Sequence, residues 1–343
     1  MKRISSLDGF RALAIIMVVL THARLSTGFP VQFRDAMVHG AVGVNVFFVI
    51  SGFLITTLLL NEQIDKGKIN VKHFFIKRAF RILPVALLYL VFVFLWRTRE
   101  NIGLKDMDII RGLTFTINFS PGRGSWFIGH YWTLSIEEQF YIFWPAIMII
   151  FRKNLKMMLI LLIAYSCIIK ALVHHYPILD EITLSSFFSY SDSIFIGALG
   201  GIFYIENPGL CQHKILKNYW MQLGAISFFV LFVLLKDAGA ASYICVPFAN
   251  VIIAGATIFL ILAYINPSAT IIFKLLNSRI LTHLGILSYS IYIWQQFFIF
   301  GARATWWRTF PNNILVIYLV ALGSYYLWEK PFLKLRQLFI GKT

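Results

Sequence analysis

Three ionisable residues near the N-terminus interrupt a stretch that is otherwise apolar enough to cross a membrane. Asp8, Arg11 and His22 lie within SSLDGFRALAIIMVVLTHARLSTGFP (5–30), and ionisable groups inside such a stretch are costly and usually functional. On a helix, Arg11 and His22 share one face, about three turns and roughly 16 Å apart. Histidine suits proton transfer, and arginine suits phosphate or carboxylate binding. Alternatively, both residues could be structural, with the Arg11 side chain extending to the lipid headgroups and His22 buried in the protein core.

Two arginines precede the proline at which a later apolar run begins. In FFIKRAFRILP (74–84), Arg78 and Arg81 have i, i+3 spacing, and Pro84 follows them. This spacing predicts one face of a short helix, where two guanidiniums could bind phosphate through paired donors. Ordinary anchoring of a membrane protein by cytoplasmic basic residues explains the pair equally well.

Adjacent carboxylates begin an aromatic-rich run. In GHYWTLSIEEQFYIFWP (129–145), Ser135, Glu137, Glu138 and Gln139 follow His130 within the first turns of an expected span. Two neighbouring carboxylates cannot both face lipid without a large cost, so at least one must meet a cation or a wet cavity. The spacing does not decide which glutamate faces the site.

Further polar residues occur in the later apolar runs. Asp192 is the acidic residue of SYSDSIFIGALGG (189–201), where it could instead cap a helix. In LGILSYSIYIWQQ (284–296), Ser288, Tyr292 and either Gln295 or Gln296 fall along one helical stripe. Glu329 ends the last apolar run, two residues before Pro331. We treat Asp192, Tyr292 and Glu329 as candidate substrate-binding or supporting residues.

Small residues favour close helix packing in GAVGVNVFFVISGFLI (40–55). Gly40, Gly43, Ser51 and Gly52 would let another helix approach closely. We expect this stretch to serve packing, with Asn45 as the one polar residue that suggests more.

The composition indicates a polytopic membrane protein. The 343 residues are 59% hydrophobic and 17% aromatic but only 13% charged, and the mean hydropathy is +0.74. A water-soluble globular protein of this size is excluded. The formal charge of +16 comes from basic clusters between apolar runs, which is typical of cytoplasmic loops and does not favour nucleic-acid binding. Three scattered cysteines indicate neither a disulfide framework nor a metal site.

We predict an all-α fold of about ten transmembrane helices. The candidate spans are 10–29, 40–59, 83–96, 130–151, 157–173, 186–205, 219–235, 243–265, 281–300 and 314–328. With both termini in the cytoplasm, that side carries roughly twice as many basic residues as the other. The segment near 100–129 is expected to be re-entrant or interfacial, because its apolar part is too short to cross. Without a linker or repeat, residues 1–343 are expected to form a single membrane domain.

Taken together, these stretches resemble the acyltransferase-3 family of integral-membrane acyltransferases. The resemblance rests on a set of motifs that occur in the family's order: LDGFRA with Arg11 and His22, FFVISGFLI, the Arg78–Arg81 pair before Pro84, WTLSIEEQFYIFWP, SYSIYIW, and Glu329 with Pro331. It extends over nearly the whole chain. One departure concerns the residue after SYSIYIW, where the family often has histidine and this chain has Gln295. A proton-handling role at that place is therefore in doubt.

The resemblance implies transfer of an acyl group, usually acetyl, from acyl-CoA to a hydroxyl of a sugar, polysaccharide or glycolipid of the cell envelope. His22 would be the general base, with Glu137 and Glu138 as further catalytic candidates. Arg11, Arg78 and Arg81 would hold CoA, with Asp8, Ser135 and Gln139 in support. We expect a stand-alone transferase of the bacterial cytoplasmic (inner) membrane, without a permanently bound cofactor or metal. The oligomeric state is left open.

A proton-coupled transporter or flippase of an envelope precursor is the alternative function. Such a protein would also bury Asp, Arg, His and Glu along a polar path. The sequence shows neither an inverted repeat nor a corresponding pair of broken helices, which many transporters contain. The acyltransferase is therefore the preferred hypothesis.

Overall fold

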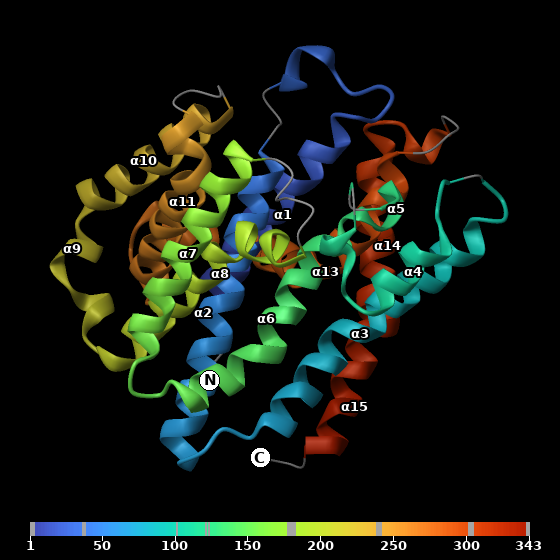
Figure 1. Cartoon of the computed structure of the whole chain (residues 1–343). Helices are drawn as coiled ribbons and strands as arrows, with labels where there is room; N and C mark the ends of the chain where they lie inside the picture. The colour runs from blue at the N-terminus through green and yellow to red at the C-terminus, as the bar shows by residue number, and fades with distance from the viewer. Residues whose placement is uncertain are drawn as a thin grey trace. The chain divides into compact units, whose positions relative to one another are not determined.

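The computed structural model of the chain is helical throughout the part that it describes (Figure 1). It describes residues 4–35, 39–100, 102–120, 122, 124–176, 183–237, 242–300 and 305–340. Two compact units interleave along the sequence: unit 1 comprises residues 1–16, 41–69 and 136–286, and unit 2 comprises 17–40, 70–135 and 287–343. The single membrane domain expected from the sequence stays a prediction.

The helices have the following bounds. The longer α-helices are α1 (Ser5–Ala23), α2 (Gly40–Lys66), α3 (Val71–Trp96), α6 (Tyr131–Ile150), α7 (Leu155–His175), α8 (Thr183–Glu206), α10 (Tyr219–Asp237), α11 (Ser242–Tyr264), α13 (Arg279–Ile299), α14 (Asn312–Ser324) and α15 (Lys330–Ile340). The short ones are α4 (Asp106–Leu113), α5 (Trp126–Gly129), α9 (Lys214–Lys217) and α12 (Ile271–Leu276). Single 3-10 turns are η1 (Val31–Phe33), η3 (Ile117–Phe119), η6 (Leu210–Gln212) and η7 (Trp306–Arg308), and η8 (Tyr325–Glu329) is a π-helical segment.

Six helices in the described part are long and apolar enough to cross a membrane: α1, α2, α3, α7, and the stretches Ser186–Glu206 of α8 and Val246–Tyr264 of α11. This supports a polytopic membrane protein. The other four expected spans also form helices, namely α6, α10, α13 and α14, but each falls short in either length or hydropathy. The count of ten spans stays a prediction. Both termini, residues 1–3 and 341–343, lie outside the described residues, so their cytoplasmic location stays a prediction too.

Some expected element boundaries were wrong. The first helix ends at Ala23 rather than near residue 29, because Gly28 adopts a φ of +83° and Pro30 follows in an extended conformation. Pro84 does not begin a new span: it lies inside the continuous helix α3. By contrast, the helices α4, η3 and α5, which lie within the described part of 100–129, are each too short to cross a membrane, as the sequence predicted.

In unit 1, α7, α8 and α11 pack against one another, and α10 packs on α11 (Figure 1). Helices α2 and α8 touch at backbone level: a Cβ on Gly52 would lie 2.0 Å from the carbonyl oxygen of Ile194, and one on Gly197 would lie 2.1 Å from that of Val49. The small residue Gly52 therefore serves helix packing, as the sequence predicted. In the same unit, the Asn45 side-chain amide donates to the carbonyl of Asn250 at 3.3 Å.

In unit 2, the C-terminal helices pack along α3. Helix α15 and the π-helical segment η8 both contact α3, and α14 continues directly into η8 (Figure 1). Tyr131, which is fully buried, donates from its hydroxyl to the carbonyl of Ala86 on α3 at 2.7 Å. These contacts fix α3, which carries Arg78 and Arg81.

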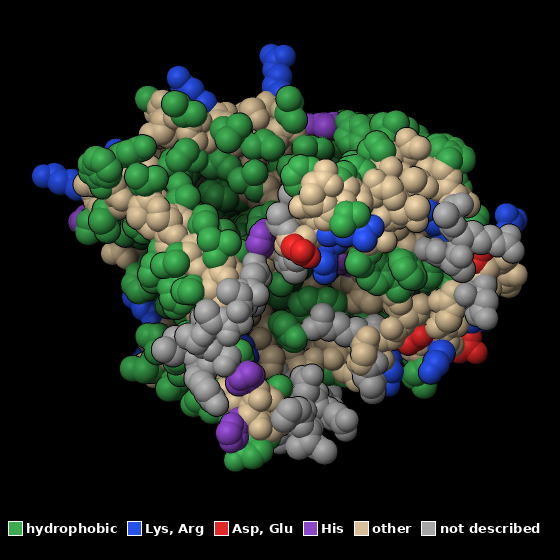
Figure 2. Space-filling view, turned by 90° about the horizontal axis from the view of Figure 1, so that it is seen from above, with side chains coloured by type: hydrophobic (Ala, Val, Ile, Leu, Met, Phe, Trp, Pro, Cys, Tyr) green, Lys and Arg blue, Asp and Glu red, His purple; other side chains and the backbone are tan. Residues whose placement is uncertain are grey.

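Hydrophobic side chains occupy much of the surface, as the face drawn in Figure 2 shows. On α3 and α7, Val91, Leu95, Leu161 and Ile168 are each more than half exposed. Exposure of such apolar side chains to water is unfavourable, whereas their contact with lipid tails is not. The apolar exterior agrees with a membrane-embedded chain.

The contact between α2 and α8 generates a stability prediction. Gly197→Ala should destabilise the protein by about 1–3 kcal/mol, because the added methyl would overlap backbone atoms that cannot move independently. The measurement is the midpoint of thermal unfolding of the purified protein in detergent.

Gly255→Ala provides the matched control. Gly255 also lies within a helix, α11, but has open space where a Cβ would lie. Because alanine favours a helix over glycine by roughly 0.5–1 kcal/mol, this variant should be neutral or slightly stabilised. Equal midpoints for the two variants would contradict the close contact.

Candidate functional site

His22 lies in the last turn of α1 and contacts two residues from distant parts of unit 2. Its Nδ1 atom is 3.1 Å from Oε1 of Gln295 on α13. Its ring meets the Trp126 ring edge to face, with 5.5 Å between centroids. The side chain is only partly buried, whereas Gln295 is fully buried. His22 is thus held on one side, and its ring remains partly accessible.

A second histidine is held by the next residue of α13. The Oε1 atom of Gln296 is 2.7 Å from Nδ1 of His130 and also accepts from the His130 backbone N–H at 3.2 Å. Tyr292 donates to the His130 carbonyl at 3.0 Å and pairs with the Thr133 hydroxyl at 2.6 Å. This network is buried. It fixes the turn before α6 against α13.

The segment after α1 is tied down by short polar contacts. Ser26 donates to the carbonyl of Ile299 at 3.3 Å and accepts from the Asn313 amide at 2.7 Å. Gly40 lies so close to Thr21 that a Cβ there would be 2.9 Å from the threonine Cβ. These contacts position the end of α1, and with it His22, relative to the end of α13.

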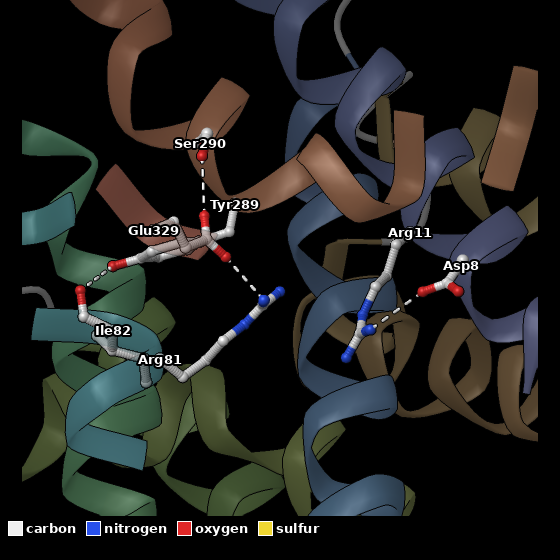
Figure 3. A network of polar contacts seen from close by, with 7 residues as sticks. All are labelled: Asp8, Arg11, Arg81, Ile82, Tyr289, Ser290 and Glu329. Atoms are coloured by element: carbon white, nitrogen blue, oxygen red, sulfur yellow. Dashed lines mark hydrogen bonds and ion pairs between the residues drawn. The ribbon is translucent and has the colours of Figure 1, made fainter. Parts of the chain in front are cut away.

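Asp8 and Arg11 form an ion pair near the start of α1, in unit 1. Their side chains approach to 3.4 Å, and the carboxylate is nearly buried (Figure 3). The helix packs very closely here, because a Cβ on Gly9 would lie 2.2 Å from the Leu276 carbonyl oxygen and one on Gly285 would lie 1.9 Å from that of Asp8. The expected i, i+3 pairing is therefore present. The 3.6-residue repeat of the continuous helix α1 gives Arg11 and His22 the expected shared face.

Glu329 is a fully buried carboxylate that receives donors from two helices of unit 2. Arg81 of α3 approaches one carboxylate oxygen at 2.7 Å, and Ser290 of α13 donates to the other at 2.9 Å (Figure 3). Tyr289 donates to the Ile82 carbonyl at 2.8 Å. This arrangement satisfies a charge that would otherwise be very costly to bury.

The structure changes the interpretation of the Arg78–Arg81 pair. Both residues lie within α3, not on a separate short helix, because the chain remains helical through Pro84. The indole nitrogen of Trp328 donates to the Pro84 carbonyl at 2.8 Å, which holds η8 against this part of α3. Arg81 also has an internal partner in Glu329. Its side chain nevertheless remains 30% exposed, and a guanidinium has five donors.

The carboxylates of α6 differ in the contacts that the structure gives them. Glu137 accepts from the Ser51 hydroxyl of α2 at 2.7 Å. Ser135 is buried and donates back to the Tyr131 carbonyl at 2.8 Å, an ordinary contact within a helix. Glu138 and Gln139 lie on the same helix and are partly buried. Glu137 is thus the carboxylate bonded to α2.

Asp192 does not cap a helix. It lies in the interior of α8, fully buried, and forms an ion pair with the nearly buried Lys170 of α7. The capping interpretation was wrong because α8 begins at Thr183, well before the aspartate. Two neighbouring helices of unit 1 therefore neutralise each other's buried charge.

The predicted site residues fall into several clusters. Unit 2 contains His22, Tyr292 and the pair of Arg81 with Glu329, and unit 1 contains the contacts of Arg11, Glu137 and Asp192. Sequence reasoning missed the histidine partners Gln295 and Gln296, the contacts of Trp126, and Ser290 as a donor to Glu329. The two glutamines carried a signal, since one or the other was expected on the polar stripe with Ser288 and Tyr292, and Gln295 also replaces a histidine of the resembling family. Among the described residues, no group of three His, Cys, Asp or Glu side chains could hold a metal.

The geometry around His22 suits the transfer of a proton. One ring nitrogen contacts a neutral amide, so the other is the atom that can exchange a proton with a bound molecule. Arg24 and His130 are charged or titratable groups close enough to influence the ring. A neutral imidazole that is oriented by a fixed partner is the usual form of a general base.

Comparison with known proteins identifies the family of the chain. The chain matches the acyltransferase domain of the acyltransferase-3 family over residues 4–328. The O-acetyltransferase OatA of Staphylococcus aureus (strain NCTC 8325 / PS 47) is 28% identical over 322 residues, which cover 84% of this chain and 49% of the relative. A Staphylococcus aureus (strain COL) protein, named provisionally as an O-acetyltransferase, is also 28% identical over 322 residues, covering 86% of this chain and 50% of the relative.

The name of a third relative states the polymer that it acetylates. The peptidoglycan O-acetyltransferase OatA of Listeria monocytogenes (serovar 1/2a, strain EGD-e) is 32% identical over 174 residues, which cover 45% of this chain and 26% of the relative. The chain spans about half the length of the first curated relatives it matches. No solved structure shows significant similarity. Because the family match extends over nearly the whole chain, this protein belongs to the acyltransferase-3 family.

Proposed function

We propose that the protein is a membrane-bound O-acyltransferase that moves an acetyl group from acetyl-CoA to a hydroxyl of a cell-envelope sugar, polysaccharide or glycolipid. The observation that carries the proposal is the His22 imidazole, held through one nitrogen by Gln295, in a chain of the acyltransferase-3 family. The relatives named as O-acetyltransferases support acetyl as the group transferred. The name of the Listeria relative supports an envelope polymer as acceptor.

The proposed reaction is direct transfer. The acceptor hydroxyl gives its proton to His22 while its oxygen attacks the thioester carbonyl. The carbon–sulfur bond then breaks, the ester remains on the acceptor, and the CoA sulfur takes a proton from the imidazolium. A hydroxyl is a poor nucleophile at neutral pH, so a positioned base contributes typically 10²–10⁴-fold to such a step.

The arginines are proposed to hold the donor. Arg11 lies on the same helix as His22, and a helical rise of 1.5 Å per residue separates them by about 16 Å along α1. This length is comparable to that of a pantetheine arm. Arg78 and Arg81 would bind the nucleotide phosphates, because guanidiniums offer paired donors to phosphate oxygens. The exposed part of Arg81 supports this use despite its contact with Glu329.

Other residues are proposed to support the site rather than react. The nearly buried Asp8 and the bonded Glu137 neutralise or hold polar groups within unit 1, and Glu138, Ser135 and Gln139 of α6 are proposed to line the polar path. Tyr292 fixes the turn at His130, Glu329 orients Arg81, and Asp192 balances Lys170.

Donor binding is proposed on the cytoplasmic side of the bacterial inner membrane, with both termini in the cytoplasm. The basic residues that would lie on that side support this orientation, and acyl-CoA is a cytoplasmic metabolite. The acceptor would reach the other end of the His22 helix.

The first test uses purified protein in liposomes with labelled acetyl-CoA and a soluble peptidoglycan or polysaccharide fragment. The wild type should release CoA and form an ester on the fragment in equal amounts. His22→Ala should lower the rate about 10²–10⁴-fold, because the hydroxyl would lose its base. Release of CoA is measured with a thiol reagent, and the ester by mass spectrometry.

Leu13→Ala serves as the matched control, since Leu13 is a partly exposed residue of the same helix. It should retain near-normal turnover. A wild-type protein that neither binds nor cleaves acetyl-CoA would indicate the transporter alternative. Near-normal turnover by His22→Ala would contradict the assignment of the base.

A second test separates the structural and donor-binding roles of Arg81. Arg81→Ala alone should destabilise the protein by about 1–3 kcal/mol, because Glu329 would be buried without its ionic partner. Adding Glu329→Gln should restore the midpoint of thermal unfolding, since a neutral amide needs no cation. The restored double variant should still show a raised KM for acetyl-CoA with a smaller change in kcat, because remote phosphate contacts contribute mainly uniform binding.

Glu329→Gln alone is the control for the double variant. It keeps Arg81 and should keep a KM for acetyl-CoA close to that of the wild type. Normal KM in the double variant would show that Arg81 serves only to neutralise the buried carboxylate.

A third test concerns Arg11. If its planar guanidinium binds the donor, Arg11→Lys should lose activity nearly as completely as Arg11→Ala, because an ammonium cannot reproduce the paired donors. We expect at least about a 100-fold loss of turnover for both variants. The measurement is acetyl transfer at matched protein levels.

The double variant Asp8→Asn with Arg11→Gln distinguishes donor binding from simple charge pairing. It removes both charges of the ion pair and leaves two neutral amides of similar size. Under the proposal it remains inactive although it is folded. Activity in the double variant or in Arg11→Lys would return Arg11 to a structural role.

A further inference from the structure

Gln295 and His22 contact each other through atoms whose roles can be assigned. Oε1 of Gln295 is 3.1 Å from Nδ1 of His22. A neutral imidazole has one N–H and one nitrogen lone pair, and an amide oxygen only accepts. Contact with Oε1 therefore requires the hydrogen to be on Nδ1. The lone pair is then on Nε2, which is the atom that can remove a proton from a hydroxyl.

The neighbouring glutamine makes the same kind of contact, and its orientation is fixed independently. Oε1 of Gln296 faces both Nδ1 and the backbone N–H of His130. A backbone N–H can only donate, so the atom facing it must be the amide oxygen. His130 consequently also carries its hydrogen on Nδ1. Two successive residues of α13 thus present acceptors to two histidines.

The remaining contacts hold the His22 ring in this position. Trp126 packs its ring against His22 and donates its indole N–H to the Gln296 carbonyl at 3.1 Å. Gln295 is fully buried, and its Nε2 has no hydrogen-bond partner within the described part of the chain. A buried amide hydrogen without a protein partner is uncommon.

We propose that Gln295 is a positioning residue that holds His22 with its hydrogen on Nδ1, so that Nε2 receives the proton of the acceptor hydroxyl. The inference rests on the proposed role of His22 as general base. The residue that positions His22 in this chain is thus a glutamine, whose amide cannot titrate, at a position where the family that the sequence resembles often has a histidine. Arg24 and His130 are among the charged or titratable groups that influence the His22 ring, and a carboxylate introduced at position 295 would place a negative charge beside it.

The test compares two substitutions that differ in hydrogen bonding. Gln295→Met keeps the length of the side chain but cannot accept, and it should lower kcat for acetyl transfer about 10–100-fold with little change in the KM for acetyl-CoA. Gln295→Glu keeps an acceptor and cannot donate. Its kcat should approach that of the wild type at high pH, while the acidic limb of its pH–rate profile moves to higher pH, because the carboxylate stabilises the imidazolium.

The opposite pattern would overturn the proposal. If the amide nitrogen rather than the oxygen faced His22, the wild-type ring would carry its hydrogen on Nε2, and Gln295→Glu, which can only accept, would raise kcat above that of the wild type. Wild-type kcat in Gln295→Met would show that the contact is without consequence. Gln222→Met is the matched control, because Gln222 is a buried glutamine of unit 1 that donates to the Leu216 carbonyl and accepts from the Tyr264 hydroxyl. It should leave the pH–rate profile unchanged.

A measurement without turnover separates this proposal from the proposed function. Diethyl pyrocarbonate modifies unprotonated imidazole, and the modified His22 peptide can be quantified by mass spectrometry across pH. The pH at which His22 becomes reactive should rise in Gln295→Glu. This measurement does not require the Gln295→Met variant, so it tests the proposal even if Gln295→Met fails to fold. An unchanged reactivity profile would refute the contact. A shifted profile in a protein that transfers no acetyl group would refute only the proposed function.

Discussion

A polar side chain among apolar helices is stable only where another polar group satisfies it, and this requirement connects helices that are far apart in the sequence. The Glu329 carboxylate needs Arg81 and Ser290, and these contacts join η8, α3 and α13. His22 meets Gln295 across an interval of 273 residues. The same pairing that makes burial tolerable therefore also determines which groups face one another and how each is oriented.

The features that the sequence predicted correctly are local ones. Apolar runs and helical spacing identified α1 with Arg11 and His22 on one face, and the small residue Gly52 indicated a close helix contact. These properties depend on neighbouring residues along one helix, so a single sequence contains them. The family resemblance added an expected chemistry that spacing alone could not supply.

The features that sequence reasoning missed depend on tertiary packing. Pro84 was expected to begin a helix, but α3 continues through it. Along its length α3 packs against α15 and η8, which are distant in the sequence. Asp192 was interpreted as a possible cap, although its partner, Lys170, lies on another helix. Gln295 lies 273 residues from His22, and Arg81 lies 248 residues from Glu329, and local rules contain no information about such pairs.

The amide at position 295 has a consequence for how the site responds to pH. A histidine there would place a second titrating imidazole beside His22, and the two protonation steps would then belong to the pair rather than to either residue. A glutamine cannot change its charge, so His22 keeps one partner in one state over the whole range of pH. Under the proposed function, the residue that holds the base therefore adds no protonation step of its own.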